Sequence, residues 1–309
     1  MRNAFADELM ALAARDERIV LLSGDIGNRI FDPFKQAFPD RFYNCGVAEA
    51  SMMSLAAGLA LTGLRPVVYT ITTFATYRCF EQIRVGVAYH DAPVIIVGTG
   101  SGLSYASLGP THHSLEDMAI LRAVPGMTVL APCDSNELRA GLAEALTLDA
   151  PCYIRIGKKG EPLIHETPPA LTIGKAITLR DGSDICLIGS GTITSVVIDA
   201  AEWLGDYGIS ARVESFPSIK PLDEERLGEI FGRFDIVAVA EEHGRIGGLY
   251  GAIAEWLAGQ PDGKSARLLA FGTDDRFMHT IGSQAYARES FGLSASHIGE
   301  ACRHALGQI

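Results

Sequence analysis

Residues 44–71 read NCGVAEASMMSLAAGLALTGLRPVVYTI and hold the pattern that decides the fold. After a glycine, residues 48–63 are rich in alanine, methionine and leucine, which predicts a helix. Residues 66–71 form a short apolar run, which predicts a buried strand. A helix that leads directly into a strand is typical of a parallel α/β sheet, because parallel strands need crossover connections.

The same alternation continues on both sides of this stretch. Further strands are predicted at 19–23, 93–98, 127–132 and 152–156, and further helices at 75–90, 116–123 and 134–148. Asp134, followed three residues later by Glu137, is typical of a helix N-cap with its capping-box partner. This order predicts a parallel sheet covered by helices on both faces.

Residues 158–175 interrupt the alternation with prolines, glycines and mixed charges, which predicts an inter-domain linker. A second series follows, with strands predicted at 184–191, 211–216, 236–242 and 266–271 and helices near 193–207 and 247–259. A chain of 309 residues has room for about two domains. We therefore predict two tandem α/β domains, residues 1–165 and 166–309.

The composition excludes some classes of partner. A net charge of −11 argues against nucleic acid or an anionic membrane surface as the main partner. The chain has no signal-peptide pattern and no apolar stretch of about 18 residues, so we expect a cytoplasmic protein. Its six cysteines are scattered without a CxxC pair, which favours free thiols over disulfides or a metal site.

Two segments carry side chains suited to chemistry, and each is ambiguous on its own. Glu49 is the carboxylate in the first turn of the helix 48–63. It is either an acid favoured by the helix dipole or a proton-transfer group in an apolar pocket. Phe74, Tyr77 and Phe80 recur every three residues, so they share one helical face, which forms either core or a wall for a heteroaromatic ring.

A third segment, 98–122 (GTGSGLSYASLGPTHHSLEDMAILR), is a glycine- and serine-rich loop after a predicted strand. Loops at that position bind ligands in α/β folds. Gly109 and Pro110 fix a turn ahead of the His112–His113 pair. Metal binding explains the two histidines poorly, because no third ligand has suitable spacing.

In this order, the segments resemble the C-terminal half of transketolases and, more distantly, 1-deoxy-xylulose 5-phosphate synthase. The markers are G-V-A-E at 46–49, T-F at 73–74, G-P-T-H at 109–112 and A-P-C-D-S-N-E at 131–137. The resemblance spans essentially the whole chain. It implies a pyrimidine-binding domain over residues 1–165 and a transketolase C-terminal domain over 166–309.

The resemblance also implies thiamine diphosphate as cofactor. In that family the glutamate of G-V-x-E hydrogen-bonds the aminopyrimidine ring and activates the cofactor, so Glu49 is expected to be catalytic. The histidine of G-P-T-H lies near the reacting carbon, so His112 is expected to be catalytic and to contact the substrate. The further contacts that the resemblance implies are Asp25, Phe74, Tyr77 and Phe80 with the cofactor, and Arg2, Arg29 and Arg155 with an anionic substrate.

Two departures from the family pattern fall on the substrate side. The aspartate that precedes G-P-T-H in transketolases is Leu108 here, and the histidine expected twelve residues before His112 is Gly100. We therefore expect a substrate that differs from the standard pentose phosphates. Arg29 is expected to supply the anion contact that Gly100 cannot make.

The chain has no GDG triplet, which in this family helps to hold the cofactor's diphosphate and its Mg²⁺. A metal-bound diphosphate needs oxygen ligands. We therefore expect a GDG-bearing partner subunit in an α2β2 assembly that moves a two-carbon ketol unit from a ketose, expected to carry a phosphate, to an aldehyde. Two alternatives stay open, namely a synthase-like carboligation of a 2-oxo acid and a non-catalytic subunit that kept the fold.

Overall fold

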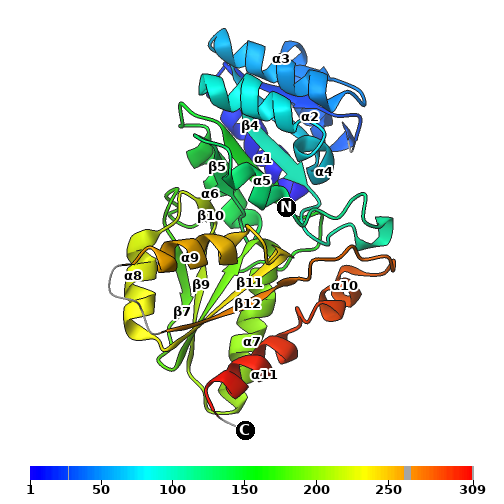
Figure 1. The fold of residues 1–309 in the computed structure, drawn as a ribbon. Coiled ribbons are helices and arrows are strands. Elements are labelled where there is room, and N and C mark those ends of the chain that lie inside the picture. The colour runs from blue at the N-terminus through cyan, green and yellow to red at the C-terminus, as the bar shows by residue number, and fades with distance from the viewer. Residues whose placement is uncertain (27, 261–265, 308–309) are drawn as a thin grey trace.

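The computed structural model describes residues 1–26, 28–260 and 266–307 and contains two β-sheets. The first sheet has seven strands in the order β10-β5-β6-β4-β3-β1-β2, and the second has five in the order β12-β11-β8-β9-β7. Figure 1 shows one sheet above the other, each with helices packed on it. The prediction of two tandem α/β domains is confirmed.

The first sheet is parallel except at one edge. Its strands from the first half of the chain are β1 (Ile19–Ser23), β2 (Phe42–Asn44), β3 (Arg65–Ile71), β4 (Ile95–Thr99), β5 (Thr128–Leu130) and β6 (Cys152–Ile156). All of these except β2 are buried at every position, as a sheet covered on both faces requires. The edge strand β10 (Ser218–Lys220) comes from the second half of the chain and pairs antiparallel with β5.

Helices cover the first sheet on both faces. They are α1 (Arg2–Ala13), α2 (Asp32–Ala37), α3 (Glu49–Leu61), α5 (Asp117–Arg122) and α6 (Ser135–Ala145). Asp134 caps α6 as predicted, because its carboxylate accepts the N–H groups of Asn136 and Glu137 at 2.9 and 2.8 Å. The carboxylate of Glu137 reaches past the cap and accepts the N–H of Cys133 at 2.5 Å, so the predicted capping box is only half formed.

The prediction of one helix over 75–90 is wrong. The segment begins earlier, as α4 (Thr72–Thr76), and continues as a π-helix (Gln82–Val87) and a 3₁₀ turn (Ala88–His90). The hydroxyls of Thr72, Thr73 and Thr76 donate to the backbone carbonyls of Thr99, Thr111 and Thr72, respectively. Such side-chain bonds compete with regular helix geometry and bend helices.

The second sheet follows a segment, residues 157–176, that has no helix or strand. The boundary that we predict near residue 165 lies within this segment. The sheet consists of β7 (Ile177–Arg180), β8 (Ile185–Ser190), β9 (Ala211–Ser215), β11 (Ile236–Gly244) and β12 (Arg267–Thr273). Its helices are α7 (Thr194–Asp206), α8 (Glu224–Arg233), α9 (Leu249–Ala258), α10 (Gln284–Ser290) and α11 (Ala295–Ala305).

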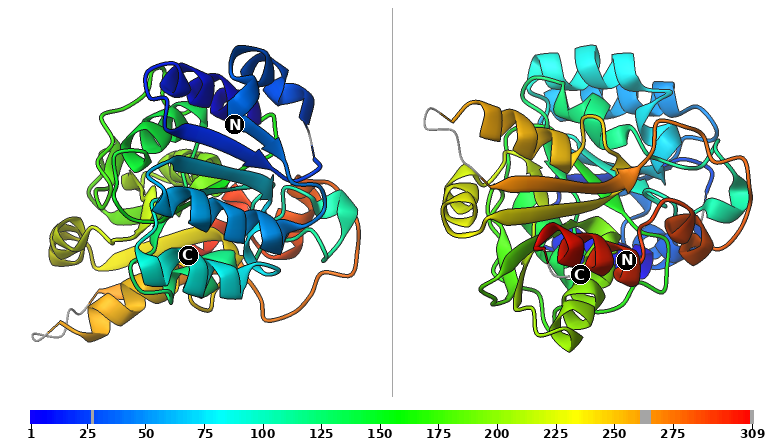
Figure 2. Two further views of the ribbon diagram at one scale, coloured as in Figure 1. Left: turned by 90° about the horizontal axis from the view of Figure 1, so that it is seen from above. Right: turned by 60° about the horizontal axis from the view of Figure 1, so that its bottom comes forward.

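Among the described residues after 165, the sequence prediction lacks β7, β10, α8, α10 and α11. Figure 2 shows α11 beside α7 on one side of the second sheet, with α8 and α9 toward the other. One apolar cluster contains residues of both domains, including Met118 of α5 and Leu249 of α9. The two domains therefore share part of their core. Among the described residues, no helix is long and apolar enough to cross a membrane.

Candidate active site

The predicted site residues gather at one edge of the first sheet. Asp25, Glu49, Phe74 and His112 follow β1, β2, β3 and β4, respectively. The carboxyl ends of parallel strands meet at the same edge of a sheet, where α/β proteins bind ligands. The parallel topology therefore brings together residues that are up to about 90 positions apart in the sequence.

Glu49 begins α3 and is 5% exposed. It follows Gly46, whose φ of +67° lies in the left-handed region that favours glycine. The carbonyl of Gly46 accepts the N–H of Asp25 at 2.9 Å, and the side chain of Asn44 donates to the carboxylate of Asp25 at 3.0 Å. Asp25 and the turn before Glu49 are thus held together.

Arg78 is a site residue that the sequence analysis missed. Its guanidinium donates to Oε2 of Glu49 at 3.3 Å and lies 3.9 Å from the centroid of the Phe74 ring. The edge of the His112 ring faces Phe74, with centroids 5.3 Å apart. Burial, and after it the charge of Arg78, lower the pKa of His112, so its neutral imidazole is favoured near pH 7. We call Glu49, Phe74 and Arg78 the carboxylate–aromatic pocket.

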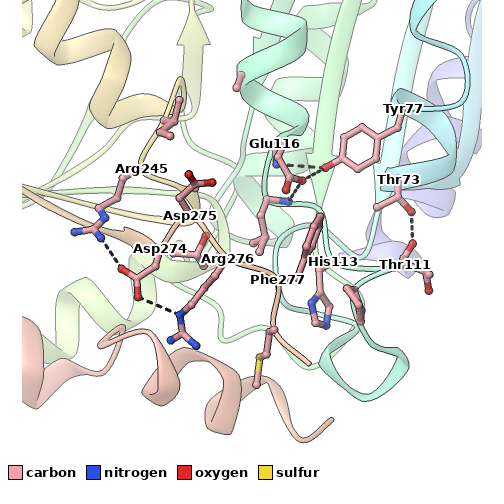
Figure 3. A pocket seen from close by; sticks show the side chains of 17 residues that line it. Thr73, Tyr77, Thr111, His113, Glu116, Arg245, Asp274, Asp275, Arg276 and Phe277 are labelled. Carbon is pink, nitrogen blue, oxygen red and sulfur yellow. Dashed lines mark hydrogen bonds and ion pairs between the residues drawn. The ribbon is translucent and has the colours of Figure 1, made fainter. Parts of the chain in front are cut away.

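The other two predicted aromatic contacts point elsewhere, because the segment is not one regular helix. The hydroxyl of Tyr77 donates to Oε2 of Glu116 at 2.7 Å, and Phe80 packs against the apolar core. Figure 3 shows Tyr77 and His113 on a cavity of about 770 Å³ between the G-P-T-H loop and residues 273–278. The prediction that Phe74, Tyr77 and Phe80 share one helical face is therefore wrong.

The structure contradicts the predicted contact between Arg155 and the substrate phosphate. The guanidinium of Arg155 is bound by both carboxylate oxygens of Asp117, at 2.9 and 3.1 Å. The side chain of Arg155 is 3% exposed and that of Asp117 is fully buried. Contact with a ligand would break this buried ion pair, which is strongly unfavourable. In contrast, Arg29 is exposed and Arg2 is half-buried at the start of α1.

Comparison with known proteins identifies the family. The model for "Transketolase, pyrimidine binding domain" matches residues 1–161, and that for "Transketolase, C-terminal domain" matches residues 174–298. The chain belongs to the transketolase family. The predicted resemblance is thereby confirmed, and the chain is a transferase subunit of the transketolase type.

Individual relatives are named as transketolase subunits. The chain is 37% identical to the 6-deoxy-6-sulfo-D-fructose transketolase subunit SqwH of Clostridium sp. (strain MSTE9), over 96% of this chain and 92% of that protein. It is 34% identical to a subunit of the apulose-4-phosphate transketolase of Phocaeicola vulgatus, over 99% and 96%. A solved split gene transketolase, an inactive β4 tetramer, matches with a TM-score of 0.89 and 33% identity, over 99% and 98%.

Next to His112, this transketolase subunit has a cationic group. The sequence analysis predicted one of its members, Arg2, but not Lys158. Nε of Arg2 donates to the carbonyl of Lys158 at 2.9 Å, and Nζ of Lys158 lies 4.7 Å from the centroid of the Tyr105 ring. The Tyr105 ring meets that of His112 edge-on, with centroids 5.9 Å apart. We call Arg2, Lys158 and Tyr105 the cation–tyrosine group. Its lysine sits in the predicted linker, where a charged residue gives no signal of its own.

Tyr105 also gives the departure at Gly100 a structural reason. Gly100 has a φ of +77°, and a Cβ at this position would collide with the Tyr105 ring. The ring thus fills the space that a side chain at position 100 would need. Leu108, the other departure, is 51% exposed on the same loop. The region around Gly100 and Leu108 therefore differs in construction from the family pattern.

The transketolase subunit offers a poor site for Mg²⁺. Among residues 1–26, 28–260 and 266–307, one group of three potential metal ligands has its donor atoms within 4.8 Å of one another, namely Cys133, Glu137 and His165. Sulfur and imidazole ligands suit softer metals, whereas Mg²⁺ prefers oxygen. The carboxylate of Glu137 already accepts hydrogen bonds from the hydroxyl of Ser215 and the N–H of Cys133.

Proposed function

We propose that this subunit supplies the pyrimidine side and the substrate side of a two-component transketolase that acts on an anionic ketose. The observation that carries the proposal is a series of contacts. Arg78 joins the buried Glu49 to Phe74, the Phe74 ring meets that of His112, and the His112 ring meets that of Tyr105 in the cation–tyrosine group. The relatives named for sulfofructose and apulose 4-phosphate act on sugars with an anionic end. Arg2 and Lys158 suit such an end, because charge-assisted hydrogen bonds are the stronger ones.

The carboxylate–aromatic pocket fits the pyrimidine of thiamine diphosphate. When bound, this cofactor supplies a nucleophilic carbon that carries the two-carbon unit. Glu49 holds or shares a proton at a ring nitrogen, and its 5% exposure keeps water from competing for it. Phe74 offers a flat face against which a heteroaromatic ring stacks. We propose that Asp25, which is held beside the turn before Glu49, adds a contact to this ring.

Arg78 occupies both binding features of the pocket in the free subunit. Its guanidinium pairs with Glu49 and covers the ring of Phe74. A pyrimidine that stacks on Phe74 and bonds to Glu49 has to displace it. The Arg78 side chain is 53% exposed, so it has room to turn into solvent.

His112 is proposed to exchange a proton with substrate oxygens. The hydroxyl of Thr111 lies 2.9 Å from its Nδ1, which orients the ring, and we propose that Nε2 faces the substrate. A neutral imidazole near pH 7 can donate at one nitrogen and accept at the other. Arg29, exposed on the loop after β1, is proposed as a further contact to the anionic end.

We propose that a GDG-bearing partner subunit completes the site in an α2β2 assembly and holds the diphosphate and Mg²⁺. Large apolar side chains are exposed next to Glu49 and after the end of the π-helix. Val47, two residues before Glu49, is 83% exposed, and Tyr89, after the π-helix, is 80% exposed. α3 and the π-helix pack side by side, so these side chains belong to neighbouring surfaces. Exposed apolar surface of this kind marks protein interfaces.

Reconstitution tests the proposal. The subunit is mixed with a purified GDG-bearing partner, thiamine diphosphate and Mg²⁺, and ketoses with a terminal sulfonate, a terminal phosphate or a neutral end are offered with aldehyde acceptors. We expect transfer from an anionic donor, seen as new ketose and released aldehyde. Consumption of pyruvate with release of CO₂ would contradict the transketolase proposal. Equal activity of wild type and Glu49→Gln would point to a non-catalytic subunit.

A further inference from the structure

The loop between β4 and α5, residues 100–116, carries His112 and is closed at its base. The N–H of Ser114 donates to the carbonyl of Gly102 at 3.0 Å, and the N–H of Gly102 donates to the hydroxyl of Ser114 at 2.9 Å. These bonds join the two ends of the segment 103–113, so the segment is a closed loop. We call residues 100–116 the histidine loop.

Residues of the second domain contact this loop and anchor it. Figure 1 shows α10 beside the long loop that follows β4. Leu103 and Ala106 of the loop form a small buried apolar cluster with Met278 and Ala287. The N–H of Gly244, at the end of β11, donates to the carbonyl of Leu115 at 2.8 Å. The loop that carries His112 is therefore anchored by residues far away in the sequence.

Glu242 of β11 is the centre of this anchor and is only 2% exposed. Its Oε1 accepts the N–H of Leu103 at 2.5 Å and the side-chain amide of Gln284 at 2.9 Å. Its Oε2 accepts Nε of Arg288 at 2.5 Å. All three partners are donors, and a guanidinium supplies the compensating charge. A carboxylate accepts at both of its oxygens, whereas an amide in its place would turn its NH₂ group toward another donor.

The loop is shaped to let Glu242 approach. Gly102 has a φ of +61°, and a Cβ there would lie 2.7 Å from both the carbonyl oxygen and Oε1 of Glu242. The buried guanidinium of Arg155 donates to the carbonyls of Ser114 and Glu242, at 3.0 and 3.3 Å. Arg155 therefore joins the base of the loop to the second domain.

We propose that Glu242 and Arg288 are positioning residues that set the place of His112 through the backbone of the histidine loop. Neither side chain needs to touch the substrate. A small displacement of a catalytic group lowers turnover strongly, because reacting atoms must stay in near-attack geometry. The effect on catalysis rests on the proposed function, whereas the effect on the loop does not.

Two measurements on Glu242→Gln test the proposal. In the isolated subunit, hydrogen exchange of the backbone amides in residues 103–113 is expected to become faster by about tenfold, the order expected on removal of a charge-assisted bond. In the reconstituted enzyme, kcat is expected to fall by about 10- to 100-fold, with an unchanged KM for thiamine diphosphate, because Glu49 and Phe74 are not affected. Arg288→Lys, which keeps the charge, is expected to retain more turnover than Arg288→Leu.

Glu289→Gln is the control, because it removes the same charge at an exposed position of α10, the helix that carries Arg288. It is expected to leave both exchange and turnover at wild-type values. The proposal is overturned if Glu242→Gln keeps wild-type exchange in the loop, or if exchange rises without any loss of kcat. If the wild-type enzyme transfers no ketol unit, the proposed function fails, and the exchange measurement still decides whether Glu242 positions the loop.

Discussion

The carboxylate–aromatic pocket and the histidine loop meet in one site but are built in opposite ways. The pocket draws its three residues from a stretch of 30, Glu49 to Arg78, and all belong to the first domain. The histidine loop depends on Arg155 of β6, on Glu242 of β11 and on Arg288 of α10. One region is thus local in sequence, and the other is supported by distant parts of the chain.

This difference indicates a division of labour between the domains. The groups that we propose to face the cofactor all belong to the first domain. The strands and helices of the second domain place none of the predicted contacts in the site. Instead, we propose that this domain sets the position of His112 through the histidine loop. Substitutions in the pocket should therefore affect cofactor chemistry directly, whereas substitutions in the second domain should act through the loop.

The largest expected effect is on the pocket side. Glu49→Gln keeps the shape of the side chain but can no longer share a proton as a carboxylic acid does. We expect kcat of the reconstituted enzyme to fall by about 100-fold or more, with little change in Tm. The exposed Glu81→Gln is the control and should keep wild-type turnover. If kcat of Glu49→Gln falls only a few-fold, Glu49 is not a catalytic residue.

The second prediction concerns the support of the histidine loop, where β11 buries two titratable neighbours of Glu242. Burial raises the pKa of Glu241 to about 7 and lowers the pKa of His243 to about 4. Ordinary values are 4.5 and 6.5. Between pH 4.5 and 6.5 the folded chain holds a proton on Glu241 and the unfolded chain holds one on His243. Because each state binds one proton, the two contributions to the pH dependence cancel.

Glu241→Gln should remove this cancellation. The stabilisation that Glu241 gives is present below its unfolded pKa and is lost as pH rises toward 7. That of His243 is present above its unfolded pKa and is lost as pH falls toward 4. When only His243 titrates, the free energy of unfolding should gain about 2 kcal/mol from pH 4.5 to 6.5, relative to wild type. Denaturant titration across this range measures it, with Glu300→Gln as control. If the free energy of unfolding changes with pH in the same way for Glu241→Gln and wild type, the contributions of Glu241 and His243 do not offset each other.

The third prediction addresses the substrate side, which lies next to the histidine loop. Lys158→Met keeps much of the apolar stem but removes the charge near Tyr105. We expect KM for an anionic ketose to rise by about tenfold, the value of one charge-assisted contact, while kcat and the KM for a neutral ketose stay unchanged. The neighbouring, exposed Lys159→Met is the control. An equal change for neutral and anionic donors would show that Lys158 does not recognise the anion.

The smallest expected effect returns to the pocket. Arg78→Ala removes the guanidinium that competes with the pyrimidine for Glu49 and Phe74. An exposed ion pair contributes about 0.2–1 kcal/mol, so the Kd for thiamine diphosphate in the reconstituted enzyme should fall by about two- to fivefold. Cofactor titration followed by fluorescence measures this, with Arg84→Ala as control. A weaker affinity in Arg78→Ala would mean that Arg78 binds the cofactor itself.

The sequence by itself determined the α/β alternation, the two domains and the family, because apolar runs and short motifs are local patterns. It also selected Glu49, Phe74 and His112, which the parallel sheet then brings to one edge. It missed Arg78, because a charged residue on a turn carries no pattern. It misplaced Arg155, because its partner Asp117 lies 38 residues away and the sequence does not show that both are buried.

Only the tertiary structure decided what surrounds the groups that we propose to be catalytic. Three contacts join segments that are not adjacent in sequence. The Tyr105 ring fills the space beside Gly100, Lys158 lies over the same ring, and Glu242 anchors the histidine loop. The physical reason is that hydrogen bonds and ion pairs depend on distance and burial in space. Neither quantity is fixed until the two domains have packed together.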